Sequence, residues 1–407
     1  MNSWDCFDTL IARIYYDPKT IFDEVGRRIN DLDFKEKRIR AEKKSKIKSY
    51  EDIYKRLPEY NPAIELDVEL EHNFPIVENI KKVKHGDLIL SDMYLPKEFI
   101  MKLLRNCGLT ANVDIIVTPN GKKKGWIWDS VKQKYNIQKH YGDNYKSDVL
   151  SAQNNDVFGV HDTAFNFNSL EKQIYEKDTN LACWMRYVRL QCPYNDPKQQ
   201  EIWNDQANIN LPVLALATLE LPNKPIAFTM RDCVYWQPLY KAMTGNSSTT
   251  LYSSRHCYKN PNEHFIEYIR QTSNGKIIVD LLGSGKSIHN FFKNQHLEYE
   301  AFYIASGLDS PQVPIMVKAG NSGLERHNSS PKLKPLVDFN ADGPIFGKYE
   351  RDVIVSNIQS NAMDLAVKSS KYFNIKRNKE LLQFFVDLMD NDYTTKNTEW
   401  SSKRRKK

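Results

Sequence analysis

Four short segments in the first 150 residues constrain the fold and the chemistry of this chain most: residues 3–10, 88–92, 122–128 and 142–148. The first is an apolar run that meets a carboxylate at Asp5, and the second ends in a serine and an aspartate. An apolar strand that ends in this way places its polar group at the carboxyl edge of a sheet, where open α/β folds bind ligands in a crevice. The sequence therefore predicts an α/β fold with a parallel sheet and a polar site at one edge.

The polar residues of these segments form the set that phosphoryl transfer to a protein carboxylate requires. Such a transfer needs an oxygen nucleophile, a divalent metal, a cation that spreads the transition-state charge and a hydroxyl that holds a phosphoryl oxygen. That set is supplied by Asp5, Asp143 or Asp148, Lys122 and Ser91. Magnesium accepts hard oxygen ligands and keeps several waters, so two or three carboxylates and a substrate phosphate are enough to hold it.

Residues 5–10 (DCFDTL) and 90–96 (LSDMYLP) resemble the haloacid-dehalogenase superfamily of hydrolases, and in particular a bacterial and viral branch of it. The likeness covers about residues 1 to 165. It implies that Asp5 is the nucleophile, that Ser91 is the phosphate-binding hydroxyl, and that Asp143 is a magnesium ligand with Asp148 beside it.

The same resemblance indicates which lysine is the cationic partner. In the superfamily this lysine precedes an apolar pair by five and six positions, which selects Lys122, with Ile127 and Trp128 as the pair. Lys123 and Lys124 remain alternatives if the loop shifts.

One position departs from the phosphatases of this superfamily, which carry a second aspartate two residues after the nucleophile as general acid and base. Phe7 stands there. Because losing a positioned acid or base costs on the order of 10²–10⁴ in rate, we expect binding to survive better than turnover. Metal binding is less affected, since the family residue contributes its backbone carbonyl, which Phe7 also offers. Asp8 can replace the missing acid only if the chain turns at that residue, because successive side chains of a strand point to opposite faces of the sheet.

Each segment also has a plain structural interpretation. Asp5 and Asp8 can end a strand and cap a turn, and Ser91 with Asp92 can form a helix N-cap. The lysines at 122–124 can form a solvated basic turn, and residues 142–144 read equally well as a turn sequence. The occurrence of all four segments in this order favours a site.

A helical insertion is predicted over about residues 13–80, because Ile21, Val25 and Ile29 recur at helix spacing. In the resembling family, an insertion here is a cap that excludes water and sets substrate choice. Its many basic residues more often mark a solvated helix face than an anion-attracting surface. We expect a first domain over residues 1–168, followed by a connecting helix within 169–200.

The second half repeats the rhythm of strand, polar residue and helix. Apolar strands are expected at 225–230, 249–252 and 277–280, with helices near 353–372 and 379–389, which predicts a second α/β domain over residues 201–395. The strand at 277–280 leads into a glycine-rich loop and a helix, whose backbone amides present donors to an anion. A standard P-loop is excluded, because Asp280 stands where the motif requires a glycine five residues before Gly285.

This loop partly resembles the phosphate loop of phosphoribosyltransferases, in which an apolar strand ends in an acid and continues into a turn of small residues. The resemblance implies that a ribose phosphate is held by Asp280, Ser284, Gly285 and Ser287. Lys286 departs from the pattern, because it replaces a small residue. A structural strand-to-helix turn explains the segment at least as well.

Composition sets the cellular context that we expect. A chain of 407 residues exceeds the usual size of one core, and 41% hydrophobic content fits a globular protein. No run approaches the ~20 apolar residues of a membrane span, and the chain enters its first strand too early for a signal peptide. Six cysteines without paired spacing favour a reducing, cytoplasmic setting without structural zinc.

The basic character of the chain lies mainly in its last residues. Residues 403–407 supply five of the seven net positive charges. We expect residues 396–407 to be a disordered basic tail, with a nuclear-import or nucleic-acid contact as the alternative. Elsewhere no nucleic-acid or membrane partner is indicated. The expected ligands are a small phosphorylated substrate and Mg²⁺.

Overall fold

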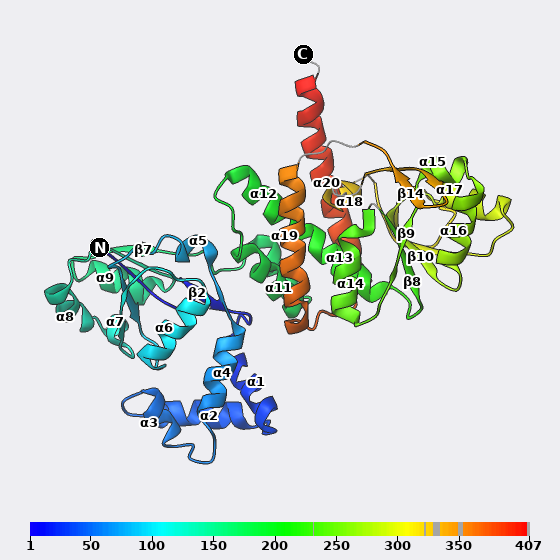
Figure 1. Cartoon of the computed structure of the whole chain (residues 1–407). Coiled ribbons are helices and arrows are strands. Elements are labelled where there is room, and N and C mark those ends of the chain that lie inside the picture. The colour runs from blue at the N-terminus through cyan, green and yellow to red at the C-terminus, as the bar shows by residue number, and fades with distance from the viewer. Residues whose placement is uncertain (231, 321–322, 329–333, 349–352, 405–407) are drawn as a thin grey trace. The chain divides into compact units, whose positions relative to one another are not determined.

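The computed structural model describes residues 1–230, 232–320, 323–328, 334–348 and 353–404, and it divides into two compact units (Figure 1). The first comprises Met1–Ser169 with Leu190–Pro193, and the second comprises Leu170–Arg189 with Tyr194–Lys407. Each unit contains a five-stranded parallel sheet, and helices lie between successive strands except between the last two strands of the second sheet. The predicted α/β fold class is therefore confirmed.

The sheet of the first unit has the order β5-β4-β1-β6-β7, and all neighbouring strands are parallel. Its strands are β1 (Asn2–Trp4), β4 (Leu88–Ser91), β5 (Asp114–Val117), β6 (Lys139–Gly142) and β7 (Phe158–His161). Numbered along the chain, this order is 3-2-1-4-5, so the direction of winding reverses between β1 and β6. Such a reversal opens a crevice at the carboxyl ends of the two strands.

Both faces of this sheet are buried, which explains why its strands are short apolar runs. Ile89 packs into one hydrophobic cluster, and its neighbours Leu88 and Leu90 pack into another with Trp128. This alternation follows from the two-residue period of a strand. The covering helices are α5 (Val77–Ile80), α6 (Lys97–Asn106), α7 (Gly121–Lys124), α8 (Ile127–Lys134), the π-helical turn η1 (Tyr145–Leu150) and α9 (Ser151–Gln153).

The chain between β1 and β4 forms a helical insertion. Its helices are α1 (Thr20–Ile29), α2 (Phe34–Lys44), α3 (Tyr50–Tyr54) and α4 (Ala63–His72). Two short antiparallel strands that the sequence did not predict, β2 (Ile11–Arg13) and β3 (Asn73–Pro75), close the ends of the insertion. Buried ion pairs hold it together, since Arg38 pairs with Glu65 and Arg13 pairs with Glu69.

The sheet of the second unit has the order β12-β11-β10-β8-β9, again with parallel neighbours. Its strands are β8 (Ile226–Met230), β9 (Thr249–Tyr252), β10 (Ile277–Leu282), β11 (Glu300–Ser306) and β12 (Ile315–Lys318). Numbered along the chain, this is the other common doubly wound order, 2-1-3-4-5, in which the winding reverses between β8 and β10. The helices that follow these strands are η3 (Asp232–Val234), α14 (Trp236–Thr244), α15 (Arg255–Lys259), α16 (Glu263–Ser273) and α17 (Lys286–Asn294).

Further helices and one hairpin complete the second unit. They are α10 (Ser169–Tyr175), α11 (Thr179–Leu190), α12 (Pro197–Asp205), η2 (Gln206–Asn210), α13 (Leu211–Glu220), α18 (Gly323–Asn328), β13 (Leu336–Asn340), β14 (Gly343–Phe346), α19 (Val353–Ser369), η4 (Ser370–Tyr372) and α20 (Lys379–Arg404). In the described part of the chain, no helix combines the length and the apolar character that crossing a membrane requires.

Two expectations for the chain outside the sheets need correction. The single connecting helix expected from residue 169 is two helices, α10 and α11, and the second of these begins just after Asp178, whose carboxylate accepts from the backbone N–H of Leu181. The tail expected to be disordered from residue 396 continues α20 as far as Arg404, because no glycine or proline interrupts that stretch. Residues 405–407 lie outside the described part.

Candidate active site

The candidate site lies at the point where the winding of the first sheet reverses. Asp5 follows β1 and Asp143 follows β6, the two strands that flank the reversal. The backbone N–H of Asp5 donates to the carbonyl oxygen of Tyr141 at 2.8 Å, and the Trp4 and Tyr141 rings stack with centroids 4.1 Å apart. These contacts fix the register of the two strands, so the two carboxylates emerge at the same edge.

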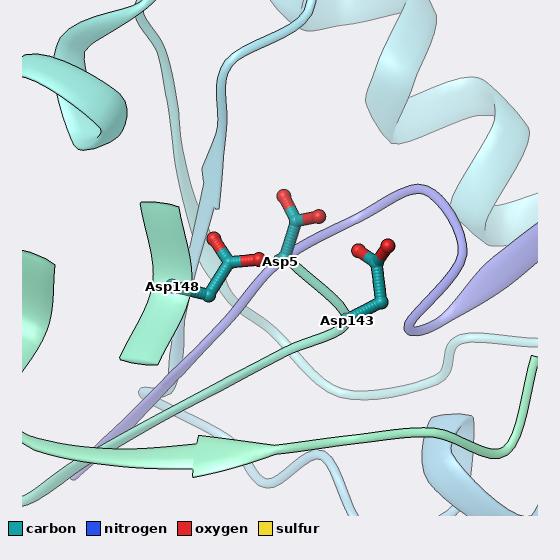
Figure 2. A group of neighbouring side chains, drawn as sticks. All are labelled: Asp5, Asp143 and Asp148. Carbon is teal, nitrogen blue, oxygen red and sulfur yellow. The ribbon is translucent and has the colours of Figure 1, made fainter. Parts of the chain in front are cut away.

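Asp148 joins Asp5 and Asp143 in a cluster in which each residue offers a carboxylate oxygen within 4.8 Å of the others. Figure 2 shows the carboxylate of Asp5 between those of Asp148 and Asp143, with Asp148 reaching the cluster from the following helix. Gly142 permits this approach, because a Cβ atom at that position would overlap the Asp148 carboxyl group.

The turn between β6 and η1 aims Asp148 at the cluster. The Asn144 side-chain oxygen accepts from the backbone N–H groups of Lys146 and Ser147, which caps the helical turn. The backbone N–H of Asn144 donates to Asp148 Oδ2 at 2.9 Å. One oxygen of Asp148 is therefore held by the backbone, and its other oxygen faces the remaining groups of the site.

Lys122 is the buried cation of the site, with 2% of its surface exposed. Its Nζ lies 2.6 Å from Asp5 Oδ1 and 2.7 Å from Asp148 Oδ1, so it bridges the two carboxylates. Lys123 and Lys124 are exposed, so the structure brings only the first lysine of the run into the site.

Short helix α7 holds Lys122 in place. The Asp92 carboxylate accepts from the backbone N–H groups of Lys122 and Lys123 at 3.0 and 3.2 Å. On the other side, the Ser151 hydroxyl donates to the carbonyl oxygen of Lys122 and accepts from Trp128 Nε1. Asp92 therefore holds the backbone of Lys122 in place.

The electrostatics of the cluster suit a cation. Burial, the main cause, raises the pKa of Asp5 to about 8 against the opposing charge of Lys122, and burial with the neighbouring Asp8 and Asp148 raises the pKa of Asp143 to about 7. Burial also opposes ionisation of Asp148, but Lys122 and His140 outweigh it and lower the pKa of Asp148. One lysine faces three carboxylates, so the donor set fits a hard divalent cation such as Mg²⁺.

Ser91 lies at the same edge as these groups. It is the last residue of β4, which pairs in parallel with β1, and 1% of its surface is exposed. Its Oγ accepts from the backbone N–H of Met93 at 3.4 Å, a weak contact that leaves the hydroxyl proton for another acceptor.

Phe7 stands where the family resemblance implies a general acid. It is buried, and the guanidinium carbon of Arg13 lies 4.4 Å from its ring centroid. Arg13 in turn binds Glu69 through two of its nitrogens. The turn does begin at Asp8, which has a positive φ of 60°, and the charge of Asp8 raises the pKa of Asp143. The alternation of side chains along a strand therefore does not exclude Asp8 as a replacement for the acid.

His140 is a site residue that the sequence did not reveal. It is fully buried, with Nδ1 2.8 Å from Ser3 Oγ and Nε2 3.4 Å from Asp148 Oδ1. The available signal was weak, because a single histidine two residues before Gly142 in a short strand is more often a core residue. Its burial, the main cause, lowers the pKa of the imidazole.

The four residues predicted to bind phosphate in the second unit lie on β10, on the loop that follows it and at the start of α17. Asp280 lies inside β10, and its Oδ1 accepts from the backbone N–H of Leu281. Ser284 accepts from the backbone N–H of Lys286 within its own loop, and Gly285 adopts a left-handed φ of 70°. No hydrogen bond between described residues connects Asp280, Ser284 and Ser287.

Two acidic residues, Asp232 and Glu325, act on the carboxyl group of Asp280. Burial is the main cause that raises the pKa of this carboxyl to about 7, and the charge of Asp232 raises it further.

No protein-family model matches this chain, and no curated protein is similar to it. Its function is therefore inferred from the geometry of the site.

Proposed function

We propose that this protein is a Mg²⁺-dependent phosphohydrolase or phosphotransferase of the haloacid-dehalogenase type, which acts on a small phosphorylated metabolite through an aspartyl-phosphate at Asp5. The observation that carries the proposal is the position of Lys122, whose Nζ bridges Asp5 and Asp148 beside Asp143 at the reversal of the sheet. A nucleophilic carboxylate, a fixed cation and an acidic metal site are together the requirements of phosphoryl transfer to a protein side chain.

The residues that would hold magnesium are Asp5, Asp143, Asp148 and the backbone carbonyl of Phe7. Both oxygens of Asp148 already accept, one from Lys122 and the other from Asn144, so direct ligation falls mainly to Asp5 and Asp143. When bound, Mg²⁺ supplies positive charge that offsets the repulsion between the carboxylates and the substrate phosphate.

The side chains then divide the chemistry. An Asp5 oxygen attacks phosphorus, the bond from phosphorus to the leaving oxygen breaks, and that oxygen keeps the electron pair and takes a proton from solvent. Lys122 and the Ser91 hydroxyl stabilise the charge on the phosphoryl oxygens. Water, or the hydroxyl of an acceptor, next attacks the same phosphorus, releases the attacking proton to solvent and frees the Asp5 carboxylate.

Phe7 favours a second candidate function. Its ring packs under Arg13 and offers no proton to the leaving oxygen. A site without a positioned acid is expected to be slower on the order of 10²–10⁴. The alternative is therefore a module that holds phosphate and metal and turns over slowly, while function lies in a phosphoribosyl- or nucleotide-sugar-binding second unit.

The setting that we propose is a reducing compartment such as the cytoplasm. All six cysteines are in the thiol form, and five of them are buried. Burial raises the pKa of Cys6, beside the nucleophile, well above its usual range, so that thiol is not a competing nucleophile.

The test is phosphate release from a panel of sugar phosphates, nucleotides and phosphoribosyl pyrophosphate, with and without Mg²⁺. Wild type is compared with Asp5→Asn and with a matched control, Asp129→Asn, which changes an exposed aspartate of the same unit. The proposal expects Mg²⁺-dependent release that Asp5→Asn abolishes and Asp129→Asn retains. Equal release from all three proteins would contradict an aspartyl nucleophile.

The second candidate makes a different prediction. If Phe7 limits hydrolysis of the aspartyl-phosphate, wild type shows a burst of one equivalent of the leaving alcohol while free phosphate appears only at the slow steady-state rate, and Phe7→Asp raises that steady-state rate. Folded protein that neither releases phosphate nor becomes phosphorylated would leave only a binding role.

A further inference from the structure

A buried hydrogen-bonded chain runs behind the candidate site, and none of the roles assigned above uses it. It joins Ser3 on β1, His140 on β6 and Asp148 on η1, and each of these residues is fully buried. Ser3 and His140 are register partners in the sheet, so their side chains meet on the same face. From Asp148 the chain continues through Lys122 to Asp5.

The partners of His140 decide which of its nitrogens carries the proton. Asp148 is bound by Lys122 and by the backbone N–H of Asn144, which both stabilise an ionised carboxylate that can only accept. His140 Nε2 therefore carries the hydrogen. In a neutral ring Nδ1 is then an acceptor, so the Ser3 hydroxyl donates to it.

These contacts determine the orientation of Asp148. Oδ2 is held by the Asn144 backbone, and Oδ1 is shared by Lys122 at 2.7 Å and His140 at 3.4 Å. Without the imidazole, Oδ1 loses its contact on the side away from the site, and the carboxylate gains freedom to rotate. Lys122 Nζ follows Oδ1, because the same ammonium group contacts Asp5.

We propose that His140, oriented by Ser3, is a positioning residue that holds Asp148 in the orientation in which Lys122 bridges Asp148 and Asp5. His140 touches neither the nucleophile nor the phosphate and acts through two other side chains. The kinetic consequence rests on the proposed function, whereas the protonation pattern does not.

A purely structural role makes a different prediction. The Trp128 and His140 rings meet edge to face with centroids 5.1 Å apart, so the imidazole also fills space in the core. If filling space were its only role, an apolar side chain of similar volume would serve as well as a hydrogen-bonding one. The space-filling role and the positioning role are therefore distinguished by whether the side chain that replaces His140 can donate a hydrogen bond.

The first experiment needs no turnover. Nitrogen-15 NMR of histidine-labelled full-length protein, with Ser3→Ala and His140→Gln for assignment, reports which ring nitrogen of His140 carries hydrogen at pH 7. We expect hydrogen on Nε2, and a changed Nδ1 signal in Ser3→Ala. A ring with no hydrogen on Nε2 would overturn the proposal.

The second experiment compares His140→Leu with His140→Gln, which keeps an amide donor near the Nε2 position. Loss of a supporting hydrogen bond behind a metal site typically costs about 10- to 100-fold, so His140→Leu is expected to lower kcat by that factor with KM unchanged. His140→Gln is expected to recover most of kcat. His72→Leu, at another buried histidine of the same unit, is the control for general destabilisation.

Equal losses of kcat in His140→Leu and His140→Gln, or a change in KM alone, would refute positioning. Wild type and Asp5→Asn are assayed beside them, so a failure of the proposed function is recognised by the absence of turnover in wild type. In that case the NMR measurement of which ring nitrogen of His140 carries hydrogen tests the proposal alone.

Discussion

The two parallel sheets of this protein both place carboxylates where the winding reverses, but they treat those carboxylates differently. In the first unit, Asp5 and Asp143 face a buried lysine. In the second unit, Asp232 and Asp280 flank the reversal between β8 and β10, and Lys286, which opens the following helix, is exposed. Strand-end carboxylates therefore occur in both sheets, whereas a buried lysine bridges two carboxylates at the first edge.

The largest expected difference between the two edges is in the response to loss of the lysine. Lys122→Met leaves the Asp5 and Asp148 carboxylates buried without their cation, so we expect it to destabilise the first unit by about 3–5 kcal/mol. Lys286→Met should stay within about 0.5 kcal/mol, because this side chain is exposed. Hydrogen exchange measured by mass spectrometry during urea titration resolves the two units. Similar, small losses in both variants would abolish the contrast.

Magnesium should distinguish the two edges next. Among the described residues, the Asp5, Asp143 and Asp148 cluster is the one group of acidic residues whose oxygens converge within 4.8 Å. At a hundred times its Kd, Mg²⁺ should stabilise the protein by about 2.7 kcal/mol. Isothermal titration calorimetry should show that Asp143→Asn weakens binding and that Asp280→Asn does not. If Asp280→Asn weakened Mg²⁺ binding and Asp143→Asn did not, the metal site would lie in the second unit.

Substituting one glycine at each edge tests whether the two edges differ in metal binding. A Cβ at position 142 would overlap the Asp148 carboxyl group, and a Cβ at Gly285 would lie 2.5 Å from Val313 Cγ1. Both Gly142→Ala and Gly285→Ala should therefore cost about 1–3 kcal/mol in thermal unfolding. Only Gly142→Ala should also impair Mg²⁺ binding, because it displaces a carboxylate of the site. Normal metal affinity in that variant would show that the position of Asp148 does not matter to the metal.

The smallest effect concerns pH and the second unit. Burial raises the pKa of Asp280 to about 7, above the 3.8 of an ordinary aspartate, so its contribution to stability is present below pH 4 and is lost as pH rises through 7. Asp280→Asn should remove that loss and stabilise the protein at pH 8, with no gain at pH 4. Denaturant titrations at the two pH values measure the difference. An equal gain at both would show that ionisation is not the cause.

Much of the fold could be predicted because short apolar runs carry it. The strands at Leu88–Ser91, Ile226–Met230 and Thr249–Tyr252 lie where their composition places them. The strands β2 and β3 escaped prediction, because three residues are too few to show an alternating pattern. Helix α20 was expected to end near residue 389, since composition alone does not separate a charged helix end from a disordered tail.

Some residues of the candidate site could likewise be predicted from the sequence, and others could not. Asp5, Ser91 and Asp143 could be selected because each follows an apolar run or a glycine turn. His140 and Asn144 could not, because their roles depend on contacts made only after β1, β6 and η1 have come together. The strand expected at 277–280 continues to Leu282, so Asp280 lies within β10 and the loop begins after it.

The sequence by itself determined that this chain forms α/β sheets and that carboxylates stand at the ends of their strands, because strand period and apolar content are local properties. The tertiary structure decided which lysine is buried, which carboxylate it meets and how His140 supports that contact. Those outcomes depend on burial and on distances between segments more than a hundred residues apart, such as the 2.6 Å between Lys122 and Asp5. Local pattern does not encode such distances.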